Sequence, residues 1–407
     1  MTVHALQNIR VLDLSRILAG PICTQILGDL GADVIKIERP GTGDDTRSWG
    51  PPFLLDRNGA PTQESAYYLC ANRNKRSLAL DIARPEGQDI IHRLLEKSDV
   101  LIENFKVGGL EKYGLSYEQI KDRYPRLIYA SITGFGQHGP LAHEPGYDFL
   151  AQGMGGLMAA TGPAGDGPTK AGVAISDYVT GLYTAIGILS GLQARTYTGR
   201  GQHVDCALLD STIAMMTNVA QYYLTSGAVA PRVGNAHSTI VPYQEFETSN
   251  GHVIIAVGND SQFRIFAKML GHEDWAQDPR FWTNAARVTH RETLISFIVP
   301  ILKTRTTQVW VDACRDADIP AGPIYRMDQV FADPHVMTRE MVTSLPHPLS
   351  QKPVDLVASP LNFSATPVDY RCAPPTLGQH TISILQDELG LTPEACAQLQ
   401  KSGAVSF

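Results

Sequence analysis

A single carboxylate, Asp177, interrupts a run of small and apolar residues that extends from Gly172 to Tyr183. Apolar residues recur after this acid at nearly the 3.6-residue period of a buried helix, at Val179, Leu182, Ile186, Leu189 and Leu192. An acid at the start of such a helix can cap orphan backbone N–H groups, or it can be a nucleophile that those groups help to aim at a substrate. The stretch alone leaves both interpretations open, and capping is the commoner outcome.

One possible phosphate ligand and two missing motifs narrow the chemistry further. Arg39 follows a predicted strand, where a guanidinium can bind a phosphate or form a surface salt bridge. The loop from Ser15 to Pro21 follows the first predicted strand and lacks G-x-G-x-x-G, so the dinucleotide fingerprint is absent. The six cysteines are scattered without a C-x-x-C pair, and no cluster of metal ligands is present, so we expect no metal site.

The elements that must position these residues alternate between strand and helix. Strand patterns at 9–14, 33–38, 77–81, 100–105 and 127–132 are separated by helical patterns near 21–30, 85–95 and 116–123, and residues 41–61 read as a loop. Alternation of this kind predicts a parallel sheet covered by helices, that is, a doubly wound α/β domain. The helix that carries Asp177, a strand at 203–208 and a long helix at 210–225 follow.

A second, smaller α+β domain is expected after residue 226. The pair Asn250-Gly251 between two apolar runs predicts a hairpin, and helical patterns continue from 261 to about 316. Residues 319–324 read as a linker that returns to the first domain, and a last helix is expected at 382–390. We therefore assign residues 1–225 and 331–407 to the large domain and 226–330 to the small domain with its linkers.

Composition excludes several classes of function. A chain of 407 residues with 43% hydrophobic and 18% charged residues is typical of a globular enzyme of two domains. The net charge of −7 argues against a nucleic-acid partner, and no apolar run approaches the roughly 20 residues that span a bilayer. The start of the chain has no secretory pattern and the cysteines read as reduced thiols, so we expect a cytoplasmic protein without a membrane partner.

An ordered set of short motifs resembles the class III CoA-transferases, the formyl-CoA transferase and carnitine-CoA transferase group also called CaiB/BaiF. The motifs span nearly the whole chain: Leu12-Asp13-Leu14, Ala19-Gly20-Pro21, Val34-Ile35-Lys36-Ile37-Glu38-Arg39, Asn74-Lys75-Arg76-Ser77, Glu103-Asn104-Phe105, Thr133-Gly134-Phe135-Gly136, Pro145-Gly146-Tyr147-Asp148, Ser176-Asp177, Thr198-Gly199-Arg200-Gly201-Gln202 and Leu377-Gly378-Gln379-His380-Thr381. Each motif is weakly specific, but their order is highly specific. The run from Gly234 to Gln244 is most similar to the succinyl-CoA-dependent dicarboxylate transferases.

The resemblance implies an architecture and a set of partners. It implies a large Rossmann-like domain built from both ends of the chain, a small α+β domain between linkers, and an interlocked, ring-like homodimer. The expected substrates are an acyl-CoA donor and a free, small carboxylic acid, with coenzyme A entering as part of the substrate and no permanently bound cofactor.

The same resemblance implies roles for particular residues. Asp177 becomes the nucleophile that forms an anhydride with the acyl group and then a thioester with CoA, and Asp148 assists or merely caps a loop. His237 could orient the acceptor acid, or it could be a linker histidine without a role. The residues expected to contact CoA are Arg16, Ile17, Leu18, Arg39, Leu80, Asn104, Phe105, Lys112 and Tyr147. The chain departs from the family pattern at Leu18, Lys112 and Pro145.

Three alternatives share features with this interpretation. The α-methylacyl-CoA racemases have the same fold but use a histidine where this chain has Tyr147, and a tyrosine of pKa near 10 is a poor base at neutral pH. An enzyme that moves CoA between two carboxylates of one acid would use the same residues. A non-catalytic acyl-CoA-binding protein would not need Asp177 in its complete motif.

Overall fold

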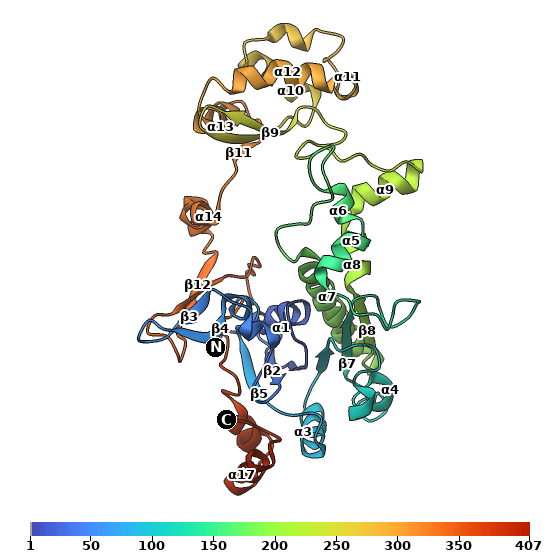
Figure 1. Cartoon of the computed structure of the whole chain (residues 1–407), viewed down its shortest axis with the longest axis vertical. Coiled ribbons are helices and arrows are strands. Elements are labelled where there is room, and N and C mark those ends of the chain that lie inside the picture. Colours follow the sequence, from blue (N-terminus) through green and yellow to red (C-terminus); the bar gives the residue numbers. More distant parts are fainter. Residues whose placement is uncertain (1) are drawn as a thin grey trace. The chain divides into compact units, whose positions relative to one another are not determined.

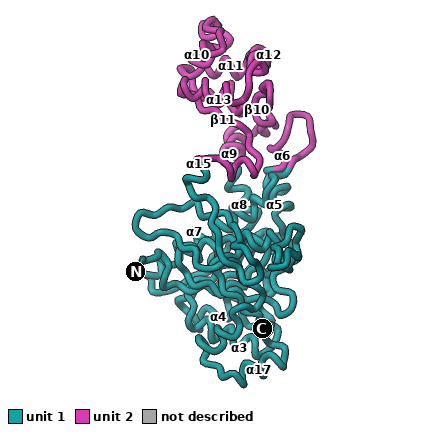
Figure 2. The backbone as a smooth tube through the Cα atoms, turned by 90° about the vertical axis from the view of Figure 1, so that its left-hand side faces the viewer, with its two compact units in different colours: residues 1–157, 170–217, 335–407 teal, residues 158–169, 218–334 magenta. Residues whose placement is uncertain are grey.

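The computed structural model describes residues 2–407, which form two compact units (Figures 1 and 2). Unit 1 holds the chain up to Leu157, Lys170–Thr217 and His335–Phe407, and unit 2 holds Met158–Thr169 and Asn218–Pro334. The sequence placed residues 158–169 in the large domain. They belong to unit 2 because Arg232 donates hydrogen bonds to the carbonyls of Ala159, Asp166 and Gly167, and Gly234 N donates to Gly162 O.

The centre of unit 1 is a six-stranded sheet in which all neighbouring strands are parallel. The strands are β1 (Arg10–Asp13), β2 (Asp33–Glu38), β5 (Lys75–Ala79), β6 (Val100–Glu103), β7 (Ile128–Thr133) and β8 (His203–Ala207). They lie in the order β5-β2-β1-β6-β7-β8, which is the doubly wound order of dinucleotide-binding folds. The predicted α/β class is therefore confirmed, although β5 begins two residues earlier than expected.

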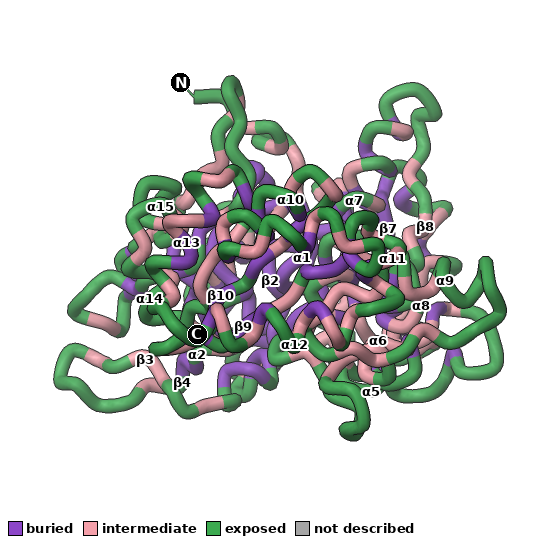
Figure 3. The backbone as a smooth tube through the Cα atoms, turned by 90° about the horizontal axis from the view of Figure 1, so that it is seen from above, coloured by how far each residue is buried: buried purple, intermediate pink, exposed green. Residues whose placement is uncertain are grey.

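Alternating side chains of this sheet serve two separate cores. On one face, Val11 and Ile102 pack against helices α1 (Ala19–Asp29) and α7 (Ile175–Thr198). On the other face, Leu12 and Leu101 pack against α3 (Pro85–Leu95) and the C-terminal elements η4 (Ile384–Glu388), a π-helical turn, and α17 (Pro393–Ser402). Because both faces are covered, the strands are apolar without strict alternation, as is typical of parallel sheets. Figure 3 shows the buried backbone, in purple, around β2 and α1.

The peripheral elements of unit 1 differ in part from the prediction. The expected loop at 41–61 contains η1 (Asp45–Ser48) and the strand β3 (Phe53–Leu55), which pairs with β4 (Pro61–Ser65). The predicted helix at 382–390 consists of a short α16 (Thr381–Ser383) and η4, and α17 follows it. The other elements are α2 (Ala66–Leu69), η2 (Glu111–Tyr113), α4 (Tyr117–Ile120), α5 (Asp148–Met154), α8 (Leu208–Met215), α15 (Pro334–Thr338), β12 (Val342–Leu345) and β13 (Val354–Val357). No helix within residues 2–407 is long and apolar enough to cross a membrane.

The helix expected at 210–225 is two helices. Helix α8 ends before Met216, and α9 (Thr217–Ser226) begins at Thr217, which has a positive φ of 34°. A positive φ is unfavourable for a β-branched residue and cannot continue a right-handed helix. A helical periodicity does not report such a local break, so the pattern merged the two helices.

Unit 2 contains an antiparallel sheet covered by helices. The hairpin of β9 (Tyr243–Thr248) and β10 (Gly251–Ala256) is confirmed, with Asn250 in its turn. The predicted linker at 319–324 contains β11 (Ala321–Pro323), which pairs with β10. Helices of this unit are α6 (Leu157–Ala160), α10 (Asp260–Met269), η3 (Glu273–Ala276), α11 (Asn284–Thr289), α12 (Arg291–Leu302), α13 (Thr307–Asp316) and α14 (Met327–Ala332). Its core of Phe263, Phe266 and Trp310, among others, is separate from those of unit 1.

Candidate active site

A cleft of about 380 Å³ lies in unit 1 beyond the carboxyl ends of β1, β6, β7 and β8. The strand order reverses between β1 and β6, and ligands of open α/β sheets bind at this switch point. The lining is Arg16, Ile17, Leu18, Ala19, Asn104, Phe105, Lys106, Val107, Gly109, Lys112, Tyr113, Ile132, Thr133, Gly134, Ala142, Glu144, Pro145, Gly146, Tyr147, Asp177 and Leu208. The topology therefore brings together most of the residues that the sequence analysis expected at a CoA site.

Asp177 is the third residue of α7 and reaches the cleft from the helix N-terminus. Its side chain is buried, at 7% exposure, and within residues 2–407 its carboxylate has no hydrogen-bond partner. Burial, together with the nearby carboxylate of Asp148, raises the pKa of Asp177 to about 7. The acid is thus neither a helix cap nor half of an ion pair, which leaves its oxygens available to an electrophile.

Asp148 is the residue that caps α7. Its Oδ1 accepts a hydrogen bond from Ser176 N at 2.8 Å, and its Oδ2 accepts one from Gln152 Nε2 at 2.7 Å. Gln152 is fully buried and also holds the loop that leads into α7, since its Oε1 accepts from Ala171 N at 2.8 Å. The capping role that the sequence left open for Asp148 is therefore real, but it serves the helix of Asp177, which frees Asp177 from that task.

The Arg16–Leu18 loop is held in a strained conformation on the opposite wall. Ile17 has φ of 74°, which costs a β-branched residue roughly 1–2 kcal/mol. Asn104 holds both backbone groups of Arg16, the residue before Ile17: its Oδ1 accepts from Arg16 N at 2.9 Å, and its Nδ2 donates to Arg16 O at 2.7 Å. Asp44 accepts from Ile17 N at 3.2 Å. Contacts from two other segments of the chain thus impose the shape of this loop.

A buried ion pair supports the loop from below. Lys36 and Asp44 are both fully buried, and Lys36 Nζ donates to Asp44 Oδ2 and to Ser15 O, each at 2.9 Å. Burial alone would raise the pKa of Asp44, but the Lys36 ammonium and hydrogen bonds from Thr46 hold it at about 2. Asp44 therefore stays ionised, and its position is fixed by charge-assisted bonds.

Two glycine turns form the floor of the cleft. Gly134 and Gly146 are in backbone contact, so that a Cβ on Gly146 would lie 2.3 Å from Gly134 Cα. A similar approach brings α7 to α1, where a Cβ on Gly181 would lie 2.7 Å from Ala19 O. Only glycine permits these distances. The close contact of α1 with α7 explains how the N-terminus of α1 comes to lie in the cleft with Asp177.

The remaining predicted residues divide into those in the cleft and those outside it. Phe105, Lys112 and Tyr147 line the cleft, and Tyr147 is 62% exposed. Arg39 is exposed and does not line the cleft. The side chain of Leu80 is 2% exposed and packs in the core against α3, its backbone N–H donates to Glu38 O, and it is not among the residues that line this cleft.

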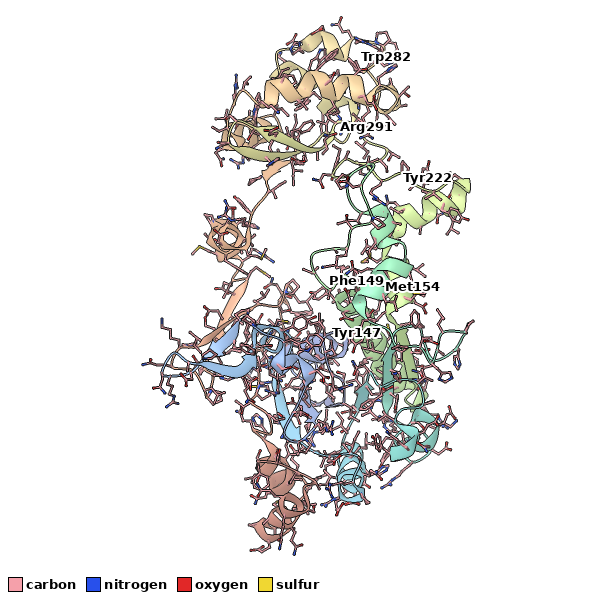
Figure 4. The ribbon with its side chains drawn as sticks, in the orientation of Figure 1. Tyr147, Phe149, Met154, Tyr222, Trp282 and Arg291 are labelled. Carbon is pink, nitrogen blue, oxygen red and sulfur yellow. The ribbon has the colours of Figure 1, made fainter. Side chains whose placement is uncertain are left out.

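His237 belongs to unit 2. Its Nδ1 accepts from Thr239 N at 3.2 Å, and its ring lies 5.3 Å from that of Tyr243. Arg291, labelled in Figure 4, donates to His237 O at 2.7 Å and to Ser238 O at 3.0 Å, while its Nη1 is buried with no partner within the described residues. The loop that carries His237 is therefore braced by a guanidinium that has no carboxylate partner.

Sequence reasoning missed an aromatic residue near Asp177. Burial raises the pKa of Tyr67 to about 12, and the charges of Asp177 and Asp148 add to this effect. Tyr67 packs against the buried cluster of Leu18, Ile22 and Ala71, and its ring meets that of Trp49 edge-on at 5.3 Å. The only sequence signal was an aromatic pair before the motif at 74–77, and it did not separate Tyr67 from the core residue Tyr68.

A doubly wound sheet with an unpaired carboxylate in its switch-point cleft is typical of an α/β enzyme that binds its substrate at this edge of the sheet. Residues 6–381 match the family described as CoA-transferase family III. The human succinyl-CoA:glutarate CoA-transferase is 40% identical over 403 residues, which is 99% of this chain and 90% of the human protein. The succinate–glutarate CoA-transferase of Agrobacterium fabrum is 44% identical over 382 residues, or 94% and 95% of the two chains.

A crystal structure of a CaiB/BaiF family protein from Brucella suis superposes on this chain with a TM-score of 0.84, at 44% identity, and covers 95% of this chain and 100% of the other. The chain belongs to CoA-transferase family III, as the ordered motifs predicted, and it is a CoA-transferase.

Proposed function

We propose that this enzyme transfers coenzyme A from succinyl-CoA to a second dicarboxylic acid, with Asp177 as the covalent nucleophile. The observation that carries the proposal is the carboxylate of Asp177, which is buried, unpaired and open to the cleft. A carboxylate in water is a weak nucleophile because hydration stabilises it. A carboxylate whose pKa burial has raised to about 7 lacks that stabilisation and is correspondingly more reactive.

The donor binds across the cleft in this proposal. Arg16 and Lys112, which line the cleft, supply cations to the phosphates of CoA, and we keep Arg39, which is exposed outside that lining, as a further phosphate contact. Ile17, Leu18, Phe105 and Tyr147 flank the apolar parts of CoA. Arg16 is half-exposed and paired with Asp45 at 2.8 Å, so a phosphate can replace that carboxylate at little cost. At position 112 the chain has a lysine, whose ammonium is a point charge, whereas an arginine guanidinium would bind two oxygens at once. We therefore expect a single phosphate contact from Lys112.

Four acyl transfers complete the reaction. Asp177 attacks the succinyl thioester carbonyl, the C–S bond breaks, and CoA leaves as a thiolate from a mixed anhydride. The thiolate attacks the Asp177 carbonyl of that anhydride, which releases succinate and forms an aspartyl-CoA thioester. The acceptor carboxylate then attacks this thioester and expels CoA thiolate from a second anhydride. The thiolate finally attacks the acceptor carbonyl, which regenerates the Asp177 carboxylate and forms the new acyl-CoA.

Each transfer develops an oxyanion that needs donors. The first N–H groups of α1 and α7 lack intrahelical partners, and the starts of both helices lie at the cleft with Asp177. Asp148 occupies one of these donors, Ser176 N, and so fixes α7 while raising the pKa of the nucleophile. Asp148 therefore assists Asp177 as a positioning residue in this proposal.

The acceptor is a dicarboxylic acid, of which glutarate is the first candidate. Two relatives that each cover more than nine tenths of the chain are named for succinyl-CoA or succinate and for glutarate. We assign orientation of the acceptor carboxylate to His237, whose loop is braced by Arg291. A charge-assisted bond from a histidine suits a carboxylate.

The racemase alternative has less support. Proton transfer at the α-carbon of an acyl-CoA needs a base near Asp177, and no residue in the described lining of the cleft is a histidine. A non-catalytic binding protein would have no need of an unpaired, buried acid. Transfer between two carboxylates of one molecule uses the same residues, and only substrate analysis separates it from transfer between two molecules.

We also propose that the active form is an interlocked homodimer. Tyr147, Phe149 and Met154 are large, apolar and exposed around α5 (Figure 4), and α7 exposes Tyr178, Leu182 and Ile186 along one stripe. An apolar surface of this extent on a monomer is typical of a protein–protein interface. Sedimentation equilibrium that returned a monomer at micromolar concentration would contradict this proposal.

We also propose that the protein works in the cytoplasm. All six cysteines are free thiols, which supports a reducing compartment.

The decisive experiment incubates the enzyme with succinyl-CoA and a panel of free acids and identifies new acyl-CoA species by mass spectrometry. We expect glutaryl-CoA from the wild type and a loss of about a thousandfold or more in rate for Asp177→Ala. Hydroxylamine should attack the activated Asp177 carbonyl, release CoA or succinate, and leave a hydroxamate at Asp177 and at no other aspartate. Equal rates for wild type and Asp177→Ala would refute the proposed nucleophile.

A further inference from the structure

The last residue of β6, Glu103, is a buried acid that does not line the CoA cleft. It is 6% exposed, and it faces a second cavity of about 220 Å³. Glu103 is in register with Ser131 on β7, and Ser131 is in register with Asp205 on β8, so these three side chains share one face of the sheet. Oε2 of Glu103 accepts a hydrogen bond from Phe105 N at 2.8 Å.

A second bond extends this contact to a histidine. Ser131 faces Glu103 across the pairing of β6 with β7, and its Oγ lies 2.9 Å from Nε2 of His203. The ring of His203 stacks on Tyr117 at 4.8 Å and meets Tyr129 edge-on at 5.4 Å, which fixes its orientation. The side chains of His203, Ser131 and Glu103 therefore follow one another along one face of the sheet, and the bond from Phe105 N–H to Glu103 joins them to the wall of the CoA cleft.

The residues beyond Glu103 form two parts of that wall. Phe105 lines the cleft directly, and its ring lies 6.0 Å from the guanidinium carbon of Arg16. Asn104, which lies between Glu103 and Phe105, clamps the strained Arg16–Leu18 loop through both backbone groups of Arg16. A shift of the backbone at 104–105 would therefore move the ring of Phe105 and the Arg16–Leu18 loop together.

We propose that Glu103 is a positioning residue for the acyl-CoA substrate, which sets the backbone of Asn104 and Phe105 according to its own protonation. This inference rests on the proposed function. As a carboxylate, Glu103 accepts from Phe105 N–H and from the Ser131 hydroxyl, and Ser131 accepts from the Nε2–H of His203. As a neutral acid it donates to Ser131, which then donates to His203 Nε2, and its bond to Phe105 loses the assistance of charge.

The charges around Glu103 support titration near neutral pH. Burial raises the pKa of Glu103 to about 7, the charge of Asp205 adds to this, and bonds from Ser131 and Phe105 N–H oppose it. Burial lowers the pKa of His203, while Asp205 and Glu118 oppose the shift and His138 adds to it. The same cavity is faced by Lys106, Glu111 and Tyr129. Asp205 is thus the one charge that acts on the pKa of both Glu103 and His203.

The test measures binding of CoA itself in an Asp177→Asn background, so that neither turnover nor ionisation of Asp177 contributes. Titration calorimetry at pH 5.5, 7 and 8.5 compares this background with the same protein carrying Glu103→Gln. Glutamine keeps an acceptor for Phe105 N–H but cannot ionise. We expect the Kd of the Glu103→Gln protein, divided by the Kd of the background protein, to be near 1 at pH 5.5 and about 10 at pH 8.5. Ionisation of the CoA phosphates cancels in this ratio.

Two further variants separate positioning from a simple structural role. Glu118→Gln alters an acid that lines the same cavity, and it should leave the ratio near 1 at every pH. Ser131→Ala removes a bond that stabilises the carboxylate form of Glu103, so the rise in ratio should move to higher pH. A ratio for Glu103→Gln that does not change with pH would overturn the inference. Failure of the Asp177→Asn protein to bind CoA at any pH would overturn the proposed function as well.

Discussion

Replacement of Asp177 by asparagine should stabilise the protein, and the gain should grow with pH. The side chain is buried without a hydrogen-bond partner among the described residues, so the charge that catalysis requires opposes folding. Asparagine has nearly the same shape and carries no charge. The proposed nucleophile thus sets activity against stability, as is common at active sites.

The size of the effect follows from the pKa of Asp177, which burial raises from 3.8 to about 7. Between these values the folded protein holds a proton that the unfolded chain has released, so the free energy of unfolding falls as pH rises. About three pKa units at 1.36 kcal/mol each set a full effect of about 4 kcal/mol above pH 7. By the same relation, about 2 kcal/mol is already lost at pH 5, so the change between pH 5 and 8 is about 2–3 kcal/mol.

Urea unfolding of wild type and Asp177→Asn at pH 5, 6, 7 and 8 measures this change as the difference between their free energies of unfolding. Contributions of all other titrating groups are common to both proteins. Asp387→Asn, which removes an exposed carboxylate from the same unit, is the matched control and should show no pH-dependent difference. The pH dependence is the diagnostic quantity, since a fixed offset can arise from the amide itself.

A constant difference between wild type and Asp177→Asn over this range would show that Asp177 has an ordinary pKa in the folded protein. A difference that shrinks as pH rises would mean that a partner stabilises its carboxylate. Either result would remove the argument that burial activates the nucleophile, although Asp177 could still be essential for turnover.

Three other substitutions test the surroundings of the cleft. Asn104→Ala removes two hydrogen bonds of about 1 kcal/mol each, so steady-state kinetics should show a KM for the acyl-CoA about 30-fold higher and a smaller change in kcat. An unchanged KM would mean that these two bonds are not needed to hold the Arg16–Leu18 loop. Asp148→Asn removes a charge that raises the pKa of Asp177, so the acidic limb of the profile of kcat/KM against pH should move below pH 7, and an upward move would contradict this electrostatic account. Gly146→Ala should lower the midpoint of thermal unfolding by several degrees or prevent folding. Gly167→Ala is the control, because its added Cβ meets nothing within 4 Å, and its stability should lie within about 0.5 kcal/mol of wild type. Equal unfolding midpoints for the two variants would exclude the close contact between Gly134 and Gly146.

Much of the fold was predictable because it follows from local patterns. The strands β1, β2, β6, β7 and β8 appear as short apolar runs bounded by turn residues, and their alternation with helices requires a parallel sheet. The hairpin β9–β10 was predictable from Asn250-Gly251. The break between α8 and α9 was not, because the positive φ of Thr217 is a local departure that hydrophobic periodicity does not encode.

The sequence could predict which residues belong to the candidate site, but not how each of them is buried or bonded. The sequence marked Asp177 as an acid at the start of an apolar helix, and the order of motifs identified the family. It did not show that the side chain of Leu80 is buried in the core, because strand residues of either face look alike in a buried parallel sheet. Tyr67 was missed for the same reason, since its neighbour Tyr68 has the same side chain but is fully buried.

The sequence by itself determined the parallel α/β architecture, the family and the identity of the reactive acid, since these depend on residue types and their order. Only the tertiary structure decided the state of that acid. Asp148, 29 residues away in the chain, caps α7 in place of Asp177, and Asn104 clamps Arg16 across 88 residues. The pKa of Asp177 depends on burial and on a neighbouring charge, and both are properties of the folded environment that no stretch of sequence contains.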